Sequence, residues 1–386
     1  MKAILPMHHS HTWIEVDLSA VKANYLQALK LAARDSVVTC VLKSNAYGHG
    51  AVPVAKALAE AGCRHFAVSC AREALMLRAH GIGGEILVMG VSEAAYLPAL
   101  SKANITIALQ SWAEGGQIAE KGCSIKIHLK VDTGFHRLGF PADDAGIAQM
   151  AEVAGLAGIQ VCGLFSHLSL VDAAHDRAQL DALLRVRDAL LSLGVDVRDT
   201  HICDSIGMVR YPEFHLSRVR IGAFLYGVRP YKSEAMPFEC RQTLSFKSTV
   251  TAIHLAHAGD YVGYDDKAPL ARDTLIATLP VGYGDGYPRR MSQRAHVLIN
   301  GKPAKVISIV CMDQMMVDIT EHPKVSCGDE ATLIGGGIDY QVLSEWAGTN
   351  RNDIITSLSA RPQRLYYMDQ KLVSAEDRLL EHTEVY

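Results

Sequence analysis

The sequence lacks the features of several protein classes. Its longest apolar stretches are broken by charge or glycine within about ten residues, short of the roughly 20 that span a bilayer. The 386 residues carry a formal charge of -3, so no basic surplus is present to neutralise the phosphates of a nucleic acid. Neither a G-x-G-x-x-G nor a Walker A run occurs. We therefore expect neither membrane insertion nor nucleic-acid binding.

The cysteines show no pairing pattern. The nine thiols are an odd number, form no C-x-x-C pair, and in several cases lie inside apolar runs. This spacing fits neither a disulfide framework nor a zinc site, and indicates buried thiols in a reducing compartment. Residues 1–13 contain one short apolar run cut by Pro6 and three histidines, which is a poor match to a signal peptide. We expect a cytoplasmic protein without a metal.

The region from residue 12 to about residue 230 alternates short β-prone runs with longer segments of helical period. Near-continuous apolar strands alternating with helices are typical of a parallel sheet covered on both faces. Eight or nine such units favour a closed (β/α)8 barrel over an open sheet. Helices are expected at 18–35, with Asp17 as N-cap, and at 174–194. The predicted strands are 12–17, 37–42, 65–69, 85–89, 105–109, 125–131, 159–166, 200–203 and 217–222.

The pattern of predicted secondary structure changes after about residue 240. Short β-prone runs are separated there by Gly, Asp, Asn and Pro turns, including the hairpin-like pair Asn300-Gly301. No Pro/Gly/Ser linker joins the two halves. The expected fold is α/β, with a TIM-type barrel at 12–242 followed by a mainly β domain at 243–386.

Polar residues lie at or just after the carboxyl ends of several predicted barrel strands. The active site of a parallel barrel lies at the carboxyl ends of its strands, so these residues are the candidates for chemistry. They are Lys43, Lys130, Asp132, Arg137, His167, Ser205 and Arg220.

Lys43 follows the apolar run VVTCVL. Burial at a strand end favours the neutral amine, and a neutral amine condenses with a carbonyl. An arbitrary lysine in this place more often reaches out to solvent. The polar, glycine-bearing turn that follows, with the phenol of Tyr47 four residues beyond, favours Schiff-base formation with an aldehyde.

Two further positions in the sequence indicate a site for an anion. Ser205 lies at a strand-to-helix turn, and the backbone N–H groups of Gly222 and Ala223 are open to close approach. Ser205 fits a plain helix N-cap equally well.

Taken together, the motifs resemble the pyridoxal-phosphate-dependent alanine racemase family, of fold type III, in order and in spacing. The resemblance runs from residue 12 to about residue 367. The motifs that carry it are VLKSNAYGHG (41–50), LKVDTGFHRLGF (129–140), GLFSH (163–167), DS (204–205), VRIGAFLYG (219–227), VGYDD (262–266), PVGYGDGY (280–287) and VCMDQMMVD (310–318).

The resemblance implies a two-base racemase that binds pyridoxal 5'-phosphate. Lys43 would hold the cofactor and act as the base on one face of the substrate α-carbon. Tyr264 would act on the other face, donated by the second subunit of a homodimer. Racemisation needs both, because one base removes the α-proton and the other returns a proton from the far side. His167 would link Tyr264 to Arg220, which would bond the pyridine nitrogen and leave it unprotonated.

The remaining roles also follow from the resemblance. The phosphate would be held by Tyr47, Ser205, Gly222 and Ala223. The substrate carboxylate would be bound by Arg137 and by the backbone N–H of Met312, on a segment that the β domain, as with Tyr264, contributes to the active site of the partner subunit. Lys130, carbamylated in many family members, would position Arg137. Tyr283 would narrow the entrance, and Asp313 would orient the Met312 segment, although a turn-forming role suits that carboxylate equally well.

Asn352 departs from the family pattern. A tyrosine that touches the phosphate and lines the substrate pocket usually occupies this place, and serine racemases of the same fold resemble this chain in carrying asparagine. The smaller amide enlarges the pocket and offers a hydrogen bond to a substrate hydroxyl. The expected substrates are therefore L-alanine and L-serine. The alternatives are a decarboxylase of the same fold and a non-catalytic pyridoxal-phosphate carrier.

Overall fold

The computed structural model describes residues 10–229, 240–264 and 268–380. The chain divides into two compact units. Of the described residues, the barrel unit comprises 21–46, 51–229 and 240, and the β unit comprises 10–20, 47–50, 241–264 and 268–380.

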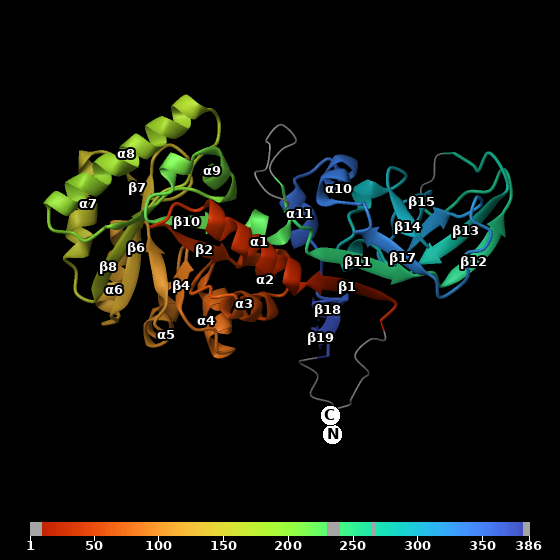
Figure 1. Cartoon of the computed structure of the whole chain (residues 1–386), viewed down its shortest axis with the longest axis horizontal. Coiled ribbons are helices and arrows are strands. Elements are labelled where there is room, and N and C mark those ends of the chain that lie inside the picture. The colour runs from red at the N-terminus through yellow and green to blue at the C-terminus, as the bar shows by residue number, and fades with distance from the viewer. Residues whose placement is uncertain (1–9, 230–239, 265–267, 381–386) are drawn as a thin grey trace, which may run out of the picture. The chain divides into compact units, whose positions relative to one another are not determined.

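The barrel unit contains eight parallel strands closed into a barrel (Figure 1). Their order is β2-β3-β4-β5-β6-β8-β9-β10, and β10 returns to pair with β2. The pairing of β5 with β6 completes the ring. The predicted TIM-type barrel is confirmed. The strands are β2 (Val37–Val41), β3 (His65–Val68), β4 (Glu85–Val88), β5 (Thr106–Leu109), β6 (Ile125–Asp132), β8 (Ile159–Phe165), β9 (Asp199–His201) and β10 (Arg218–Ile221).

Helices connect successive strands and lie outside the ring (Figure 1). They are α1 (Leu18–Leu31), α2 (Lys43–Tyr47), α3 (Ala51–Glu60), α4 (Ala71–Ala79), α5 (Leu97–Lys102), α6 (Trp112–Glu120), α7 (Asp144–Ala154), α8 (Ala173–Ser192) and α9 (Ser205–Arg210), with the 3-10 turns η1 (Ala94–Tyr96), η2 (Pro212–Phe214) and η3 (Ala223–Tyr226) and the short strand β7 (Phe140–Pro141). The predicted N-cap of α1 is confirmed, because Asp17 accepts the N–H of Ala20 at 2.9 Å.

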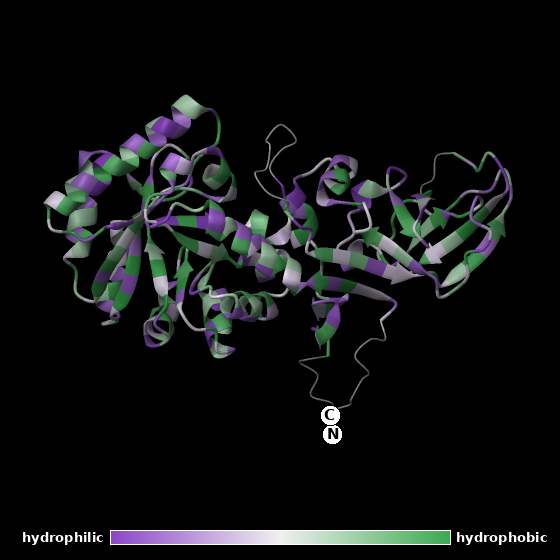
Figure 2. Cartoon of the chain, in the orientation of Figure 1, coloured by the Kyte–Doolittle hydropathy of each residue, from purple (hydrophilic) through white to green (hydrophobic). Residues whose placement is uncertain are grey.

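Helix α8 shows why these segments form helices against the barrel. Its buried side chains include Leu183, Val186 and Leu190, which recur at helical spacing along one face. Figure 2 shows the same helix alternating between hydrophobic and hydrophilic colours, as expected for an element with one face on a core.

The β unit is built on one ten-stranded sheet, in the order β12-β13-β16-β15-β14-β17-β11-β1-β18-β19. The turn at Asn300 and Gly301 joins β14 to β15 as predicted, since Ile299 pairs with Lys302. The elements are β1 (Thr12–Asp17), β11 (Leu244–Thr249), β12 (Ala252–Ala256), β13 (Thr274–Leu279), β14 (His296–Ile299), β15 (Lys302–Val306), β16 (Met315–Asp318), β17 (Glu330–Ile334), β18 (Gln363–Met368), β19 (Lys371–Glu376), α10 (Tyr340–Ala347), α11 (Arg351–Thr356), η4 (Tyr283–Asp285) and η5 (Arg289–Met291).

The placement of β1 corrects the sequence interpretation. Residues 12–17 were expected among the barrel strands, but β1 pairs antiparallel with β11 and parallel with β18. The physical reason lies in its alternation: Ile14 and Val16 are fully buried, whereas Glu15 between them is partly exposed and pairs with Lys247 at 3.1 Å. A strand with one polar face suits a one-sided sheet better than the interior of a parallel barrel.

Within the described residues, no helix is both long enough and apolar enough to cross a membrane.

Candidate active site

Lys43 begins a left-handed helical turn that contains no glycine. The φ angles of Ser44, Asn45, Ala46 and Tyr47 are 54, 55, 53 and 52°. A residue other than glycine costs roughly 1–2 kcal/mol in this conformation, so the turn needs support from its surroundings.

Glu73 of α4 provides part of that support. One of its carboxylate oxygens accepts the N–H of Ser44 at 2.6 Å, and the other accepts the N–H of Ser69 at 2.8 Å. On the far side of the turn, the Asn45 side chain accepts the N–H of Ala51 at 2.9 Å. The chain direction immediately after Lys43 is therefore fixed by side-chain hydrogen bonds as well as by the barrel strand before it.

The amine of Lys43 lies in a setting that favours loss of its proton. Burial lowers its pKa, and the positive charge of Arg137 lowers it further, whereas the carboxylate of Glu73 raises it. The net shift is downward. The predicted neutral, nucleophilic amine therefore has a physical basis in the structure.

Lys130 is a second buried amine at the same end of the barrel. It lies in β6 and is 6% exposed, with its Nζ 4.7 Å from the centre of the Phe165 ring. Burial, together with the charges of Arg220 and Arg137, lowers the pKa of Lys130 to about 7. A large share of this amine is unprotonated at neutral pH.

Arg137 follows β6 and stacks on an aromatic side chain. Its guanidinium carbon lies 4.3 Å from the centre of the Phe135 ring, and that ring lies 5.2 Å from the ring of His167. Asp132 shapes the loop by accepting the N–H of Gly134 at 3.0 Å. The loop thus places a cation beside His167.

Arg220 is buried and extensively hydrogen-bonded. Its Nη2 donates to the carbonyls of Ser166 and Ile202 at 2.9 and 2.8 Å, and its Nη1 lies 2.5 Å from Nδ1 of His201. A guanidinium has five N–H donors. After these three contacts, the Nε–H and one Nη1–H have no acceptor among the described residues, and are left for a ligand.

His167 extends this set. Its Nδ1 lies 3.3 Å from Nη2 of Arg220. Both hydrogens of Nη2 already serve the carbonyls of Ser166 and Ile202, so His167 shares one of them in a longer contact, which is favourable when Nδ1 accepts and Nε2 carries the proton. Burial and the charges of Arg220 and Lys130 lower the pKa of His167 well below its ordinary value, which agrees with a neutral ring that donates through Nε2.

Ser205 and Gly222 meet where α9 and η3 begin. The Ser205 hydroxyl oxygen accepts the N–H of Gly222 at 2.9 Å, and Asp204 caps α9 through the N–H of Ile206. The sequence predicted that the N–H of Gly222 would be free for an anion, but in this structure Ser205 engages it. The hydroxyl hydrogen of Ser205 and the N–H of Ala223 stay available, since neither makes a hydrogen bond within the described part of the chain.

A second group of predicted residues gathers in the β unit. Tyr264, Tyr283, Met312 and Asp313 line one recess of about 940 Å³. Tyr264 is 69% exposed there. Of the motif VGYDD (262–266), the first three residues, which end at Tyr264, are described, whereas residues 265–267 lie outside the described chain.

Backbone contacts hold the two loops of this recess together. The N–H of Tyr283 donates to Cys311 at 3.1 Å, and the N–H of Gly284 donates to the carbonyl of Met312 at 2.8 Å. The N–H of Met312 itself has no acceptor among the described residues. Arg361 joins the same loops through Asp313 and Asp285.

Asn352 has an unsatisfied side-chain oxygen. It lies in α11, where its backbone N–H donates to Asn350 at 2.8 Å. Its Oδ1 is buried and has no hydrogen-bond partner among the described residues. A buried acceptor left without a partner costs about 1–3 kcal/mol, which a ligand hydroxyl would relieve.

The structure therefore brings the predicted residues together in two groups. The barrel unit holds Lys43, Lys130, Arg137, His167, Ser205, Arg220, Gly222 and Ala223, and the β unit holds Tyr47, Tyr264, Tyr283, Met312, Asp313 and Asn352. Residues that the sequence interpretation missed include Glu73, His201 and Arg361. Each acts through contacts between segments far apart in the chain, so no local motif marks it.

Known proteins match this chain over most of its length. The profile of the alanine racemase N-terminal domain matches residues 16–230, and that of the C-terminal domain matches residues 243–366. This chain belongs to the alanine racemase family. The alanine racemase of Symbiobacterium thermophilum is 38% identical, with 92% of this chain and 97% of the relative covered. That of Carboxydothermus hydrogenoformans is 34% identical, with coverage of 92% and 99%.

Solved structures agree with this family assignment. The crystal structure of alanine racemase from Bacillus anthracis with bound L-Ala-P gives a TM-score of 0.92 at 29% identity, and covers 97% of this chain and 99% of that one. The racemase from the D-cycloserine producer Streptomyces lavendulae gives 0.85 at 31% identity, with coverage of 93% and 98%. As a member of this family the chain is an isomerase that acts on an amino acid.

Proposed function

We propose that this racemase interconverts the enantiomers of alanine and serine with pyridoxal 5'-phosphate, by a two-base mechanism that uses Lys43 and Tyr264. The observation that carries the proposal is the half-buried amine of Lys43 at the carboxyl end of the barrel, whose pKa is lowered by burial and by the charge of Arg137. When bound, pyridoxal phosphate supplies an aldehyde that captures amines and a ring that delocalises the charge left by removal of the α-proton.

The residues present fit this cofactor in three ways. Lys43 offers the aldehyde an amine whose pKa is lowered by burial and by Arg137. Arg220 keeps two N–H donors, one of which would meet the pyridine nitrogen and leave it unprotonated. Ser205 keeps a hydroxyl hydrogen for the phosphate, together with the N–H of Ala223. Tyr47 would complete the phosphate site, and the N–H of Gly222 would join it only on leaving the Ser205 hydroxyl.

The second base is proposed to come from a partner subunit. Tyr264 is largely exposed in the single chain, and a homodimer would cover it. The neutral His167, with its proton on Nε2, would donate to the phenol oxygen and orient it. Lys43 and Tyr264 would then hold or release the α-proton on opposite faces of the substrate. We also propose that the protein is located in the cytoplasm.

Arg137 is proposed to bind the substrate carboxylate together with the N–H of Met312, which the β domain would contribute to the active site of the partner subunit. Lys130 would assist after carbamylation, because its amine, with a pKa of about 7, is largely free to take up carbon dioxide. The resulting carbamate would carry a negative charge next to Arg137 and hold the guanidinium in place. Tyr283 and Asp313 would shape the entrance.

The test is an assay of the purified protein with pyridoxal phosphate and a panel of L-amino acids, with chiral separation of the products. D-alanine should form, and Lys43→Ala should abolish its formation. Carbon dioxide release without D-alanine would instead indicate a decarboxylase. Cofactor binding without any turnover would indicate a carrier.

Tyr264→Phe separates the two bases. In deuterium oxide, this variant should still exchange the α-proton of one alanine enantiomer through Lys43, but it should not form the other enantiomer. Equal exchange from both enantiomers would contradict the assignment of Tyr264.

Serine acceptance is proposed to depend on the amide of Asn352, supported by its unpartnered Oδ1. Asn352→Tyr should lower kcat/KM for L-serine relative to L-alanine. Asn352→Leu is the matched control, because it keeps the volume and removes the amide. If serine turnover survives in Asn352→Leu, extra room rather than hydrogen bonding explains it.

A further inference from the structure

A chain of buried polar groups continues from Arg220 into the interior of the barrel. His201 of β9 and His128 of β6 are 0% and 1% exposed, and their rings meet through Nδ1 of His128 and Nε2 of His201 at 3.0 Å. The two residues are 73 positions apart in the sequence. Neither belongs to the groups proposed to touch cofactor or substrate.

Strand β8, which lies between β6 and β9 in the sheet, is shaped to let the rings meet. A Cβ at Gly163 of β8 would lie 2.7 and 2.8 Å from ring atoms Cε1 and Nδ1 of His128. Such a contact is closer than real side chains tolerate. The absence of a side chain at Gly163 therefore makes room for the His128 ring.

Arginine chemistry fixes the direction of every hydrogen bond in this chain. Nη1 of Arg220 only donates, so Nδ1 of His201 must accept and Nε2 of His201 must carry the proton. That proton is donated to Nδ1 of His128, so the proton of His128 lies on Nε2. The three groups form one directed series, from Arg220 through His201 to His128.

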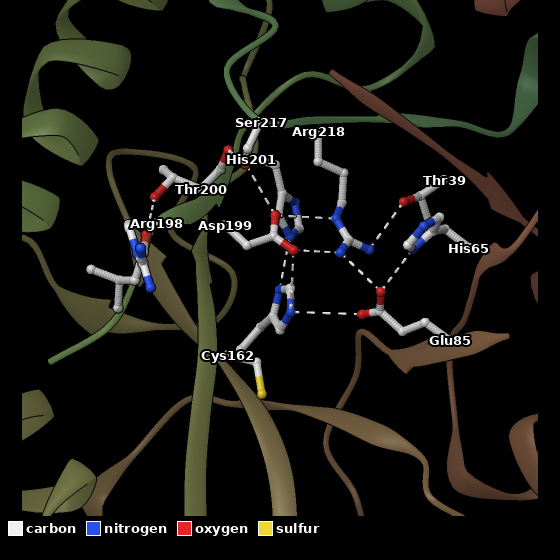
Figure 3. A network of polar contacts seen from close by, with 12 residues as sticks. Thr39, His65, Glu85, Cys162, Arg198, Asp199, Thr200, His201, Ser217 and Arg218 are labelled. Carbon is white, nitrogen blue, oxygen red and sulfur yellow. Dashed lines mark hydrogen bonds and ion pairs between the residues drawn. The ribbon is translucent and has the colours of Figure 1, made fainter. Parts of the chain in front are cut away.

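Two carboxylates stand at the far end of the series. Nε2 of His128 lies 3.7 Å from Oε1 of Glu85 and 3.9 Å from Oδ2 of Asp199. Arg218 lies between these carboxylates and bonds both, as Figure 3 shows. His65 also contacts Glu85, at 2.9 Å.

The protonation states of the two histidines and of Glu85 agree with the hydrogen-bond directions derived above. Burial lowers the pKa of His128 to about 4 and that of His201 well below its ordinary value, so both rings are neutral at neutral pH. His65 and Arg218 lower the pKa of Glu85 to about 2 despite its burial, so this carboxylate is ionised. The Nε2–H of His128 thus faces the Glu85 carboxylate, which is ionised at neutral pH.

We propose that His201 and His128 are positioning residues for Arg220, held to it by directed hydrogen bonds, with the carboxylates of Glu85 and Asp199 facing the far ring of the series. The value of this for catalysis rests on the proposed function, in which Arg220 meets the pyridine nitrogen. Without the Nδ1 acceptor of His128, the Nε2–H of His201 would be left buried and unpaired. The His201 ring would then be held less firmly against Arg220.

Two substitutions at the same position separate this role from simple packing. His128→Leu fills the site with apolar volume but offers no acceptor to His201. His128→Asn is smaller, but its Oδ1 lies where Nδ1 was and restores the acceptor. A packing role predicts that leucine is tolerated and asparagine is worse. The directed chain predicts the opposite order for the ordering of Arg220.

The first measurement is the solvent-exchange protection of the Arg220 guanidinium protons, followed by NMR in the full-length protein without added cofactor. We expect protection to fall in His128→Leu and to be retained in His128→Asn. Glu85→Gln, at a partly exposed position, should lower it to a smaller extent, and it provides a second test if His128→Leu fails to fold. Unchanged protection in the folded variants would overturn the proposal.

The second measurement is made on the protein reconstituted with pyridoxal phosphate. His128→Leu should raise the dissociation constant of the cofactor by about tenfold, as is typical when an orienting partner is lost. The 15N shift of the labelled pyridine nitrogen should move, and His128→Asn should restore both values. If the wild type does not bind the cofactor, the proposed function fails, while the exchange measurement still decides the positioning role.

His215→Leu is the matched control. His215 is 1% exposed and uses both ring nitrogens, accepting the N–H of Ala33 at 3.0 Å and donating to the carbonyl of Met208 at 2.7 Å. It lies in the same barrel unit and has no contact with the chain to Arg220. This variant should lose stability without changing the protection of Arg220 or the cofactor dissociation constant. Equal effects in His215→Leu and His128→Leu would assign both to a general loss of packing.

Discussion

Glu73 bonds the backbone directly after Lys43. Its Oε1 accepts the N–H of Ser44 at 2.6 Å, while its Oε2 accepts the N–H of Ser69, which lies just before the N-cap of its own helix, at 2.8 Å. The carboxylate therefore joins the start of α4 to the left-handed turn that begins at Lys43. Its charge also opposes the loss of the Lys43 proton.

We expect Glu73→Ala to reduce cofactor affinity and kcat/KM, each by about tenfold, because the strained turn loses a supporting acceptor. Equilibrium dialysis with pyridoxal phosphate and a racemase assay measure the two effects. The pKa of Lys43 should fall further in the variant, because a carboxylate that raises it is removed.

Glu114→Ala is the control for this prediction. Glu114 occupies the same position in the first turn of α6 and bonds the N–H of Gln110 at 3.2 Å in the same way. It has no described contact with the Lys43 turn. Equal losses in the two variants would mean that helix capping, and not support of the turn, is being measured.

Arg361→Ala should raise KM more than it lowers kcat. The guanidinium lies 2.7 Å from Asp313 and 3.2 Å from Asp285, and so joins the loops that carry Met312 and Tyr283. The exposed pair with Asp313 is worth only about 0–1 kcal/mol. The carboxylate of Asp285 is 5% exposed, so losing its cation should also lower stability measurably. Steady-state kinetics and thermal unfolding measure the two effects.

Arg272→Ala is the matched substitution, because Arg272 is an exposed arginine of the same unit that also pairs with two carboxylates, those of Asp318 and Glu321. It does not line the recess that holds Tyr264. Its KM should match the wild type. A similar rise in KM would show that lost surface charge is sufficient.

The barrel could be predicted from sequence because its strands are continuous apolar runs separated by helices of regular period. The end of a parallel strand also predicts where polar side chains collect, which located Lys43, His167 and Arg220. The error at β1 arose because strand alternation, with Ile14 and Val16 inward and Glu15 outward, was given less weight than its position before the first helix.

The supporting residues could not be predicted in the same way. The turn from Ser44 to Tyr47 contradicts local backbone preference, and only contacts from distant residues such as Glu73 make it stable. His128 and His201 lie within apolar strands and look like single buried histidines. Their pairing depends on the order of strands in the closed barrel and on the space left at Gly163.

Arg364→Met should destabilise the β unit and weaken cofactor binding together. Arg364 is 1% exposed, and donates to the carbonyls of Gly48 at 2.9 Å and Ser359 at 3.0 Å. Removing the guanidinium leaves these buried carbonyls without a partner, at about 1–3 kcal/mol for each. The Gly48 contact fixes the residue after Tyr47, so the proposed phosphate site should loosen as well.

Urea unfolding and cofactor titration measure the two effects of Arg364→Met. Arg364→Lys keeps the charge and one donor direction, and should lie between the wild type and the methionine variant in both. Loss of stability with unchanged cofactor affinity would show that the Gly48 contact does not reach the phosphate site.

Stability should fall as the pH is lowered from 7.5 to 5, in part because of His128. Burial, and next the charge of Arg218, lower its pKa from 6.5 to about 4. Between these values the unfolded chain takes up a proton that the folded protein refuses, so acid favours unfolding and the stabilisation is complete only above about pH 6.5. Glu85, with a pKa lowered from 4.5 to about 2, contributes its loss of stability only below about pH 4.5.

Urea titrations at fixed protein concentration should therefore show that His128→Asn loses about 2 kcal/mol less unfolding free energy than the wild type between pH 7.5 and 5. Parallel curves for the two proteins would mean that His128 takes up its proton equally in the folded and unfolded states.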